Sequence, residues 1–346
     1  MPTIVEVARR AGVAPMTVSR VVNESGPVSD EVRARVERAI AETGYVPNAV
    51  ARSLRSSRTH TLAIVVPDLT NPYFTTIAAG SQAAAAEAGL MLVVANTDER
   101  PAEEEAALAM LLQRRVDGIL LVTAGDGAHA ISRAAAQGTP LVAVDRKVRG
   151  RGTDSVLADS RGGAESLGRL LVTLGHRRMA VLAGPASVST SADRVAGFRR
   201  GLVATGVPAP AVFHGAYSIE SGRAMALEAV AAAPRPSAIF AANNFIAIGV
   251  LHALAEAGLR VPEDVAVVGF DDLPPSMITF PFLTVAAQPA AEMGRRAVAI
   301  LLDRIADPDR AARHVVLPTE LIVRRSSGDP LDGSLTIPTA SRGAQA

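Results

Sequence analysis

The chain has 346 residues, no cysteine and a formal net charge of +1. This length exceeds one compact core and predicts two or three domains, while the lack of cysteine excludes a disulfide framework and thiolate chemistry. No apolar run reaches the roughly 18 residues that span a bilayer, and Met1 leads into the first predicted helix without a signal-type segment, so we expect a cytoplasmic protein with no membrane contact. Residues 1–60 hold nine arginines and six acidic residues, a local charge of +3 that suits phosphate contacts at this end.

Residues 3–23 predict two short amphipathic helices joined by a tight turn. Thr3 is a suitable cap for the first helix, and Gly12 can supply the left-handed backbone of the turn. The apolar stripe of the first helix is Ile4, Val7, Ala8 and Ala11. In the second helix Val18 and Val22 are expected to point inward. The residues expected to face outward are Pro15, Met16, Ser19 and Arg20. Two such helices indicate a helix-turn-helix, whose outward face can enter a DNA major groove.

A third helix and a possible hinge follow. Ser29 can cap a helix that runs to Gly44 and closes a small three-helix core. After Pro47, a stretch of about eight residues with Val50 and Leu54 on one side predicts another helix, too short to be stable alone. We expect this segment to order only when a partner holds it.

From residue 62 onward, short apolar runs alternate with helical patterns. This alternation predicts parallel sheets covered by helices on both faces. The predicted strands are LAIVVPD, LMLVVANT, GILLV, PLVAV, RMAVLAG, AIFAAN and VAVVGF. The predicted helices lie near 72–88, 101–113, 127–137, 160–173, 191–204, 219–232, 244–257 and 290–305. Two series of strands indicate two lobes.

Several motifs in this order resemble the lactose-repressor (LacI-type) family of bacterial transcription regulators. They are AGVAPMTVSRVVN, ETGYVPN, AVARSLR, PDLTNPYF, RRVDGILL, PLVAVDR, GHRRMAVLAGP, DRVAGF, NNFIAIGVL, VPEDVAVVGFDD and TVAAQP. The resemblance covers roughly residues 3–326. It implies an all-α helix-turn-helix headpiece joined to an α/β periplasmic-binding-protein type I body of two doubly wound parallel-sheet lobes.

The resemblance also sets the expected domain boundaries. The expected parts are a DNA-binding headpiece at 1–46, a hinge helix and linker at 47–61, an effector-binding and dimerisation body at 62–327, and a disordered tail at 328–346. Within the body, one lobe would take 62–158 and 290–318 and the other 159–289 and 319–327, with crossings near 158, 289 and 319. The tail lacks a leucine-heptad helix, so we expect a homodimer.

By resemblance, the headpiece and hinge bind a pseudo-palindromic operator duplex. The implied DNA-binding residues are Thr3, Pro15, Met16, Thr17, Ser19, Arg20, Asn23, Asn48, Ala51, Leu54 and Arg55. Leu54 matches the leucine that is inserted into the minor groove at the operator's centre. Ala14 departs from the usual Ser or Thr cap of the second helix, a loss on the order of 1 kcal/mol. Pro15 and Met16 replace a commoner polar pair and suggest a non-standard operator.

Polar residues follow the predicted strands, where ligands bind in open parallel sheets. Asp68 and Asn71 follow the first strand, and the positions that match the family's effector cleft are Tyr73, Phe74, Asp145, Arg146, Asp159, Arg194, Tyr217, Asn243 and Asp271. Carboxylates, an arginine and aromatic faces suit a small polyol such as a sugar. A purine-type effector with corepressor logic stays open, because three aromatics could sandwich a base. Asn244 stands where the family usually has Asp, so the charge at that edge of the effector cleft is not settled by the resemblance.

Enzyme motifs are absent from the sequence. It holds no GxxxxGK[ST], HExxH or GxSxG, and its six histidines are far apart. We therefore expect neither catalysis nor a cofactor or metal. A ligand receptor with the same body fold is a further alternative, against which the headpiece argues. The expected function is a DNA-binding repressor controlled by a small-molecule effector.

Overall fold

The computed structural model describes residues 2–23, 25–46, 58–150, 152–274 and 281–328. The chain divides into two compact units, residues 1–59 and residues 60–346. They are called the headpiece and the body, and each is considered by itself. Among the described residues no helix is long and apolar enough to cross a membrane.

The headpiece has three helices around one small core: α1 (Ile4–Ala11), α2 (Pro15–Val22) and α3 (Asp30–Thr43). Each helix contributes one fully buried valine, namely Val7, Val18 and Val36. Thr3 accepts a hydrogen bond from a backbone N–H in the first turn of α1, and Gly12 ends α1 with a φ of 67°. The predicted cap, turn and three-helix core are confirmed, and the turn needs a residue without a Cβ penalty at positive φ.

The first lobe of the body is built on a six-stranded parallel sheet in the order β11-β5-β4-β3-β1-β2. Its strands are β1 (Thr61–Val66), β2 (Met91–Asn96), β3 (Gly118–Leu121), β4 (Leu141–Val144), β5 (Asp154–Ala158) and β11 (His314–Leu317). Its helices are α5 (Pro72–Glu87), α6 (Pro101–Gln113), α7 (Ala128–Ala136) and α12 (Ala290–Ala306). Alternate residues of β1 enter different cores: Ile64 packs with α5 and α12, and Val65 packs with α6 and α7.

The second lobe repeats this plan with the strand order β12-β10-β9-β8-β6-β7, in which β12 pairs antiparallel to β10. Its strands are β6 (Met179–Ala183), β7 (Ala211–His214), β8 (Ala238–Ala241), β9 (Ala266–Phe270), β10 (Thr284–Ala287) and β12 (Glu320–Ile322). Its helices are α8 (Ser160–Thr173), α9 (Ser189–Gly201), α10 (Ile219–Ala231) and α11 (Asn244–Glu256), followed by the 3-10 turn η1 (Arg325–Ser327). One core lies under α8 and α9 and another under α10 and α11.

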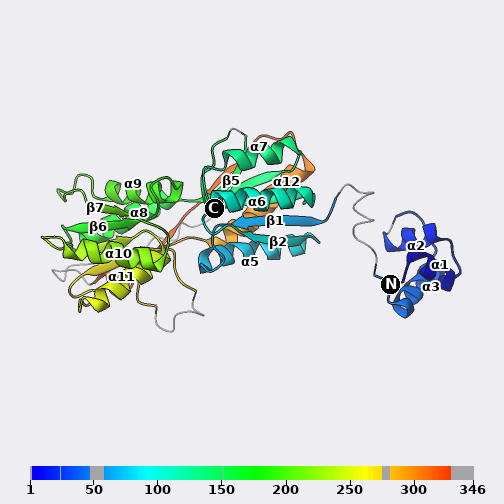
Figure 1. The fold of residues 1–346 in the computed structure, drawn as a ribbon, viewed down its shortest axis with the longest axis horizontal. Coiled ribbons are helices and arrows are strands. Elements are labelled where there is room, and N and C mark those ends of the chain that lie inside the picture. The colour runs from blue at the N-terminus through cyan, green and yellow to red at the C-terminus, as the bar shows by residue number, and fades with distance from the viewer. Residues whose placement is uncertain (1, 24, 47–57, 151, 275–280, 329–346) are drawn as a thin grey trace, which may run out of the picture. The chain divides into compact units, whose positions relative to one another are not determined.

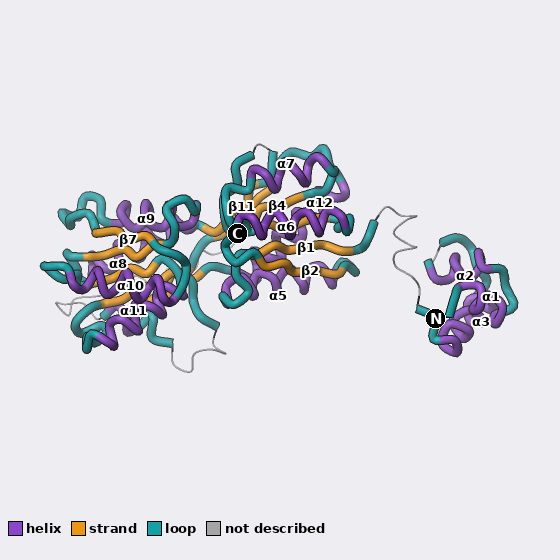
Figure 2. Tube along the Cα trace, viewed as in Figure 1, coloured by secondary structure: helices purple, strands orange, loops and turns teal. Residues whose placement is uncertain are grey.

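The chain passes between the lobes after β5, after β10 and after β11, so each lobe contains segments that are distant in sequence (Figures 1 and 2). Five strands, β5, β7, β10, β11 and β12, were not among the predicted apolar runs, and the first two show why. β5 begins at the charged Asp154, and β7 is an edge strand whose end residues Ala211 and His214 are exposed, so neither carries the continuous apolar pattern of a central strand.

Candidate functional site

The surface of α2 carries most of the headpiece residues expected to contact DNA. The exposed ones are Thr3, Pro15, Met16, Arg20 and Asn23, and Thr17 is half-buried. Met16 stands out as an apolar side chain that is 58% exposed. A long apolar side chain beside an arginine on one exposed helix face provides both apolar and hydrogen-bonding contacts.

Ser19 does not face outward, which corrects the sequence prediction. It is only 8% exposed, and Asn23 Nδ2 donates to its Oγ over 3.2 Å. Val21 is also buried, while Val22 is half-buried. Because α2 packs against both α1 and α3, its inward face is wider than a single i, i+4 stripe. At the start of α2, Ala14 makes no side-chain capping hydrogen bond, because alanine has no hydroxyl group.

The four hinge residues expected to contact DNA, Asn48, Ala51, Leu54 and Arg55, lie outside the described residues, as does the expected tail from 329 onward. The described headpiece residues that are candidates for DNA contact thus lie on and around α2.

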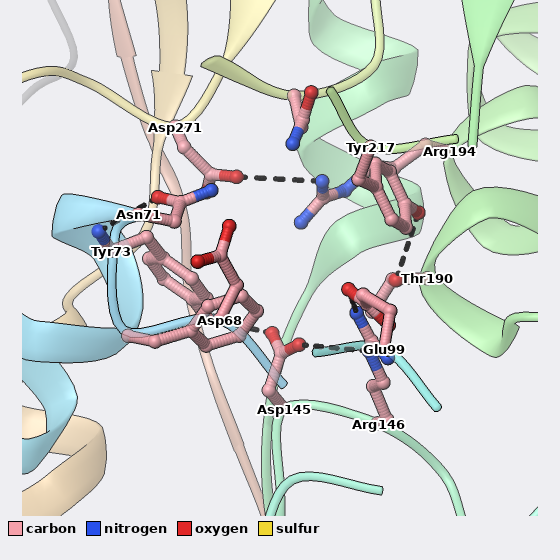
Figure 3. A pocket seen from close by; sticks show the side chains of 12 residues that line it. Asp68, Asn71, Tyr73, Glu99, Asp145, Arg146, Thr190, Arg194, Tyr217 and Asp271 are labelled. Carbon is pink, nitrogen blue, oxygen red and sulfur yellow. Dashed lines mark hydrogen bonds and ion pairs between the residues drawn. The ribbon is translucent and has the colours of Figure 1, made fainter. Parts of the chain in front are cut away.

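In the body, side chains from both lobes line one cavity, called here the effector cleft (Figure 3). The first lobe contributes Asp68, Asn71, Tyr73, Phe74, Glu99, Asp145 and Arg146. The second lobe contributes Thr190, Arg194, Tyr217, Asn243 and Asp271. These residues follow the carboxyl ends of strands in both sheets, where the strand ends of a parallel sheet meet.

Asp145 and Asp271 occupy equivalent places in the two lobes, directly after β4 and β9. Both have a left-handed backbone, with φ of 64° and 67°, which is uncommon for a residue with a side chain. Both are buried, and burial raises the pKa of each carboxyl, with Arg194 opposing the shift. Asp145 accepts a hydrogen bond from Tyr73 Oη at 2.6 Å. One strained, partly desolvated carboxylate per lobe therefore faces the cleft, a form of strain that clusters at ligand sites.

The two arginines of the cleft are held by different partners. Arg146 donates to both oxygens of Glu99, each over 2.6 Å, and to Thr123 O over 2.9 Å. Arg194 donates to Ala242 O over 2.6 Å and to Asp271 Oδ2 over 3.4 Å. The Nε atoms of both arginines are buried and have no hydrogen-bond partner among the described residues. Each guanidinium is thus fixed at the cleft by partners from its own lobe.

Two of the three aromatic rings of the cleft lie near Arg146. Its guanidinium carbon lies 5.9 Å from the centre of the Phe74 ring and 5.8 Å from that of Tyr217. Tyr73 meets Phe74 edge to face, with ring planes at 62°. Tyr217 lies against the backbone of Gly184, where an added Cβ would come within 2.2 Å of the ring. Tyr73 and Phe74 are therefore not parallel to each other, and Tyr217 packs against a glycine.

The structure brings together every expected cleft residue except Asp159. That carboxylate is exposed and caps α8, accepting from Gly162 N over 2.8 Å, so its effector role is withdrawn. Asp68 and Asn71, which were set apart from the expected set, do line the cleft. Glu99 and Thr190 were missed, although Glu99 follows a strand end and the rule applied elsewhere would have found it. Among the described residues no group of acidic or histidine side chains could hold a metal.

The two lobes are in contact around the cleft. Its free volume is about 20 Å³, room for about one water molecule. Asn71 and Asn244 exchange hydrogen bonds across the lobes. The backbone N–H of Lys147 in the first lobe donates to Ser189 Oγ of the second, and the Lys147 ammonium pairs with Asp193. The lobes are thus in direct contact, and little space is left between them at the cleft.

Comparison with known protein families decides the identity of the chain. Residues 3–48 match the family described as bacterial regulatory proteins, lacI family. Residues 59–325 match the family described as periplasmic binding proteins and sugar binding domain of LacI family. The chain belongs to the LacI family. It is therefore a DNA-binding transcriptional regulator with an effector-binding body, as the motifs implied.

Individual LacI-family relatives resemble the chain over nearly its whole length. The HTH-type transcriptional repressor PurR of Proteus mirabilis is 33% identical over 95% of this chain and 98% of its own. The ribose operon repressor of Escherichia coli is 33% identical over 94% of this chain and 100% of its own. A crystal structure of the Lac repressor dimer bound to operator and an anti-inducer superposes with a TM-score of 0.84, at 30% identity, covering 94% and 99% of the two chains. The chain is thus similar to several named repressors over nearly its whole length.

Proposed function

We propose that this LacI-family regulator is a homodimeric repressor that binds a pseudo-palindromic operator through residues 1–60 and is controlled by a sugar or sugar derivative in the effector cleft. It acts by binding and not by catalysis, and since its target is chromosomal DNA, we place it in the cytoplasm. The observation that carries the effector assignment is the pair of strand-end carboxylates, Asp145 and Asp271, one from each lobe. Each can accept hydrogen bonds from ligand hydroxyls, and a ligand that contacts both stabilises the closed arrangement of the lobes.

The arrangement of the rings favours a sugar over a purine. Sandwiching a base requires two aromatic faces that are free and roughly parallel. Here the guanidinium of Arg146 lies 5.9 Å from the centre of the Phe74 ring and 5.8 Å from that of Tyr217, and Tyr73 meets Phe74 edge to face. Carboxylates and arginines are the groups that recognise adjacent hydroxyls. A purine stays the second candidate, because the cleft holds three aromatic side chains on which a base could stack.

A thermal-shift screen of monosaccharides, disaccharides, nucleobases and nucleosides tests the assignment. A ligand at a hundredfold excess over its dissociation constant stabilises the body by about 2.7 kcal/mol. We expect a sugar to raise the melting temperature of the parent protein and to lose this effect in Asp271→Ala, while operator binding by the free variant persists. A shift with nucleobases alone would replace the sugar by a purine. No shift with any compound would reject both ligand classes.

A further inference from the structure

Asn71 and Asn244 form a complete hydrogen-bonded unit across the lobes. Asn71 Nδ2 donates to Asn244 Oδ1 over 3.0 Å, and Asn244 Nδ2 donates to Asn71 Oδ1 over 2.9 Å. The residues are 173 positions apart in sequence. Asn71 precedes α5 in the first lobe and Asn244 begins α11 in the second, and they are 4% and 1% exposed. The bonds are therefore shielded from water, which strengthens them.

Two backbone groups fix which way each amide faces. Tyr73 N–H donates to Asn71 Oδ1 over 3.0 Å, and Phe245 N–H donates to Asn244 Oδ1 over 2.8 Å. Each of these positions must hold an oxygen, because an N–H requires an acceptor. The nitrogen of each side chain is thereby directed at the other lobe. The pair works only with one donor and one acceptor on each side.

We propose that Asn71 and Asn244 are positioning residues that hold the two halves of the effector cleft together, forming a neutral clasp that sets effector affinity. The proposal rests on the proposed function, since it concerns the same cleft. The clasp is next to the ligand groups of both lobes, because Asn71 lines the cleft and Asn244 directly follows Asn243, which also lines it. The clasp itself contains no titratable group, so its contribution does not vary with pH in the native protein.

An aspartate at position 244 would break the pairing in a distinctive way. Its first oxygen could still accept from Phe245 and Asn71. Its second oxygen would replace Nδ2 and face Asn71 Oδ1 at the present 2.9 Å, acceptor against acceptor. Protonation restores a donor at that position, and burial together with this contact raises the pKa of such a carboxyl above that of free Asp. Asn244→Asp should therefore weaken closure at neutral pH and recover it in acid.

The first test measures effector affinity of parent and Asn244→Asp by calorimetry between about pH 8 and about pH 5, a range over which a buried carboxyl can titrate. At the upper end of this pH range we expect Asn244→Asp to bind the effector roughly 10- to 100-fold more weakly than the parent, because its charged form leaves a buried polar group unsatisfied. The deficit should shrink as the pH falls. The charged groups that line the cleft are Asp68, Glu99, Asp145, Arg146, Arg194 and Asp271, and they are common to both proteins. Their titration is therefore removed by comparison with the parent.

Gln137→Glu, an exposed site at the end of α7, adds the same charge away from the cleft and should match the parent. Recovery of Asn244→Asp in acid also shows that the variant is folded. A deficit that does not change with pH, or no deficit at all, would overturn the clasp.

The second test does not depend on knowing the effector. The chain has no cysteine, so Ala136→Cys and Val203→Cys place one dye on an exposed position of each lobe. Labelled protein is diluted into unlabelled protein so that each dimer carries one labelled chain at most. Energy transfer in the free protein should differ between the clasped and Asn244→Asp backgrounds at neutral pH and converge in acid. Identical transfer in both backgrounds would overturn the clasp, while failure of every sugar in the screen would reject only the proposed effector.

Discussion

Replacing Gly184 by alanine should damage effector binding by displacing Tyr217. The added Cβ would lie 2.2, 2.4 and 2.6 Å from three ring atoms of Tyr217, against an ordinary carbon contact of about 3.5 Å or more. The ring must therefore move by roughly 1.3 Å, which also stretches its 3.2 Å hydrogen bond to Thr190. Overpacking of this kind costs about 1 to 3 kcal/mol. We expect the ligand-binding position of the Tyr217 ring to carry this cost, which then corresponds to a roughly 5- to 150-fold loss of effector affinity.

Calorimetric titration of the best ligand measures this loss, and gel-shift titration should show unchanged operator affinity of the free protein. Gly125→Ala is the matched control, because its Cβ would meet Pro101 at an ordinary 3.7 Å. If the ring is the cause, adding Gly184→Ala to a Tyr217→Ala protein should cost little more, since the clash partner is gone. Parent-like affinity in Gly184→Ala, or two losses that simply add, would refute the reasoning.

Three further predictions concern the headpiece, the hinge and the first lobe. Arg20→Ala should lower the preference for operator over scrambled duplex by about 1 to 3 kcal/mol in gel-shift titration, and an unchanged preference would remove Arg20 from base recognition. Leu54→Ala should reduce the DNA bend in circular-permutation assays without altering effector affinity, and an unbent parent complex would contradict a wedge. Asp154→Asn should destabilise the body by on the order of 3 kcal/mol, because Arg304 and Arg310 lose a buried partner. Although burial acts in the opposite direction, these arginines hold the pKa of Asp154 below its ordinary value. The ion pairs therefore stabilise the folded body fully above the ordinary Asp pKa of about 3.9, and this stabilisation is lost as the pH falls through the lowered pKa of Asp154. Denaturation measured at low pH should then show the stabilities of the parent and of Asp154→Asn converging.

The sequence predicted most of the secondary structure because the central strands are continuous apolar runs. It missed five strands, among them β5, which opens on a charge, and β7, which lies at a sheet edge. The core of the headpiece was predicted by helical spacing, but the burial of Ser19 was not, because contact with two neighbouring helices is a tertiary effect. Spacing along one helix does not reveal how many neighbours that helix has.

The cleft shows the same limits. The rule that ligands bind after parallel strands found Asp145 and Asp271, since strand ends are visible in sequence. It could not tell that Asp159 turns back to cap its own helix. Nor could it show that Asn71 and Asn244 meet, because no local pattern links residues from different lobes. Those facts depend on how the two lobes close.

The most direct test of the account is a pair of calorimetric titrations of the best effector into the full-length protein, one with operator duplex and one without. If the cleft controls DNA binding, the effector must distinguish two arrangements of the protein, and operator must change effector affinity by the same factor by which effector changes operator affinity. We predict a difference of roughly 5- to 150-fold between the two titrations, as a coupling of about 1 to 3 kcal/mol gives. Equal effector affinities with and without operator would contradict the claim that this cleft controls the headpiece.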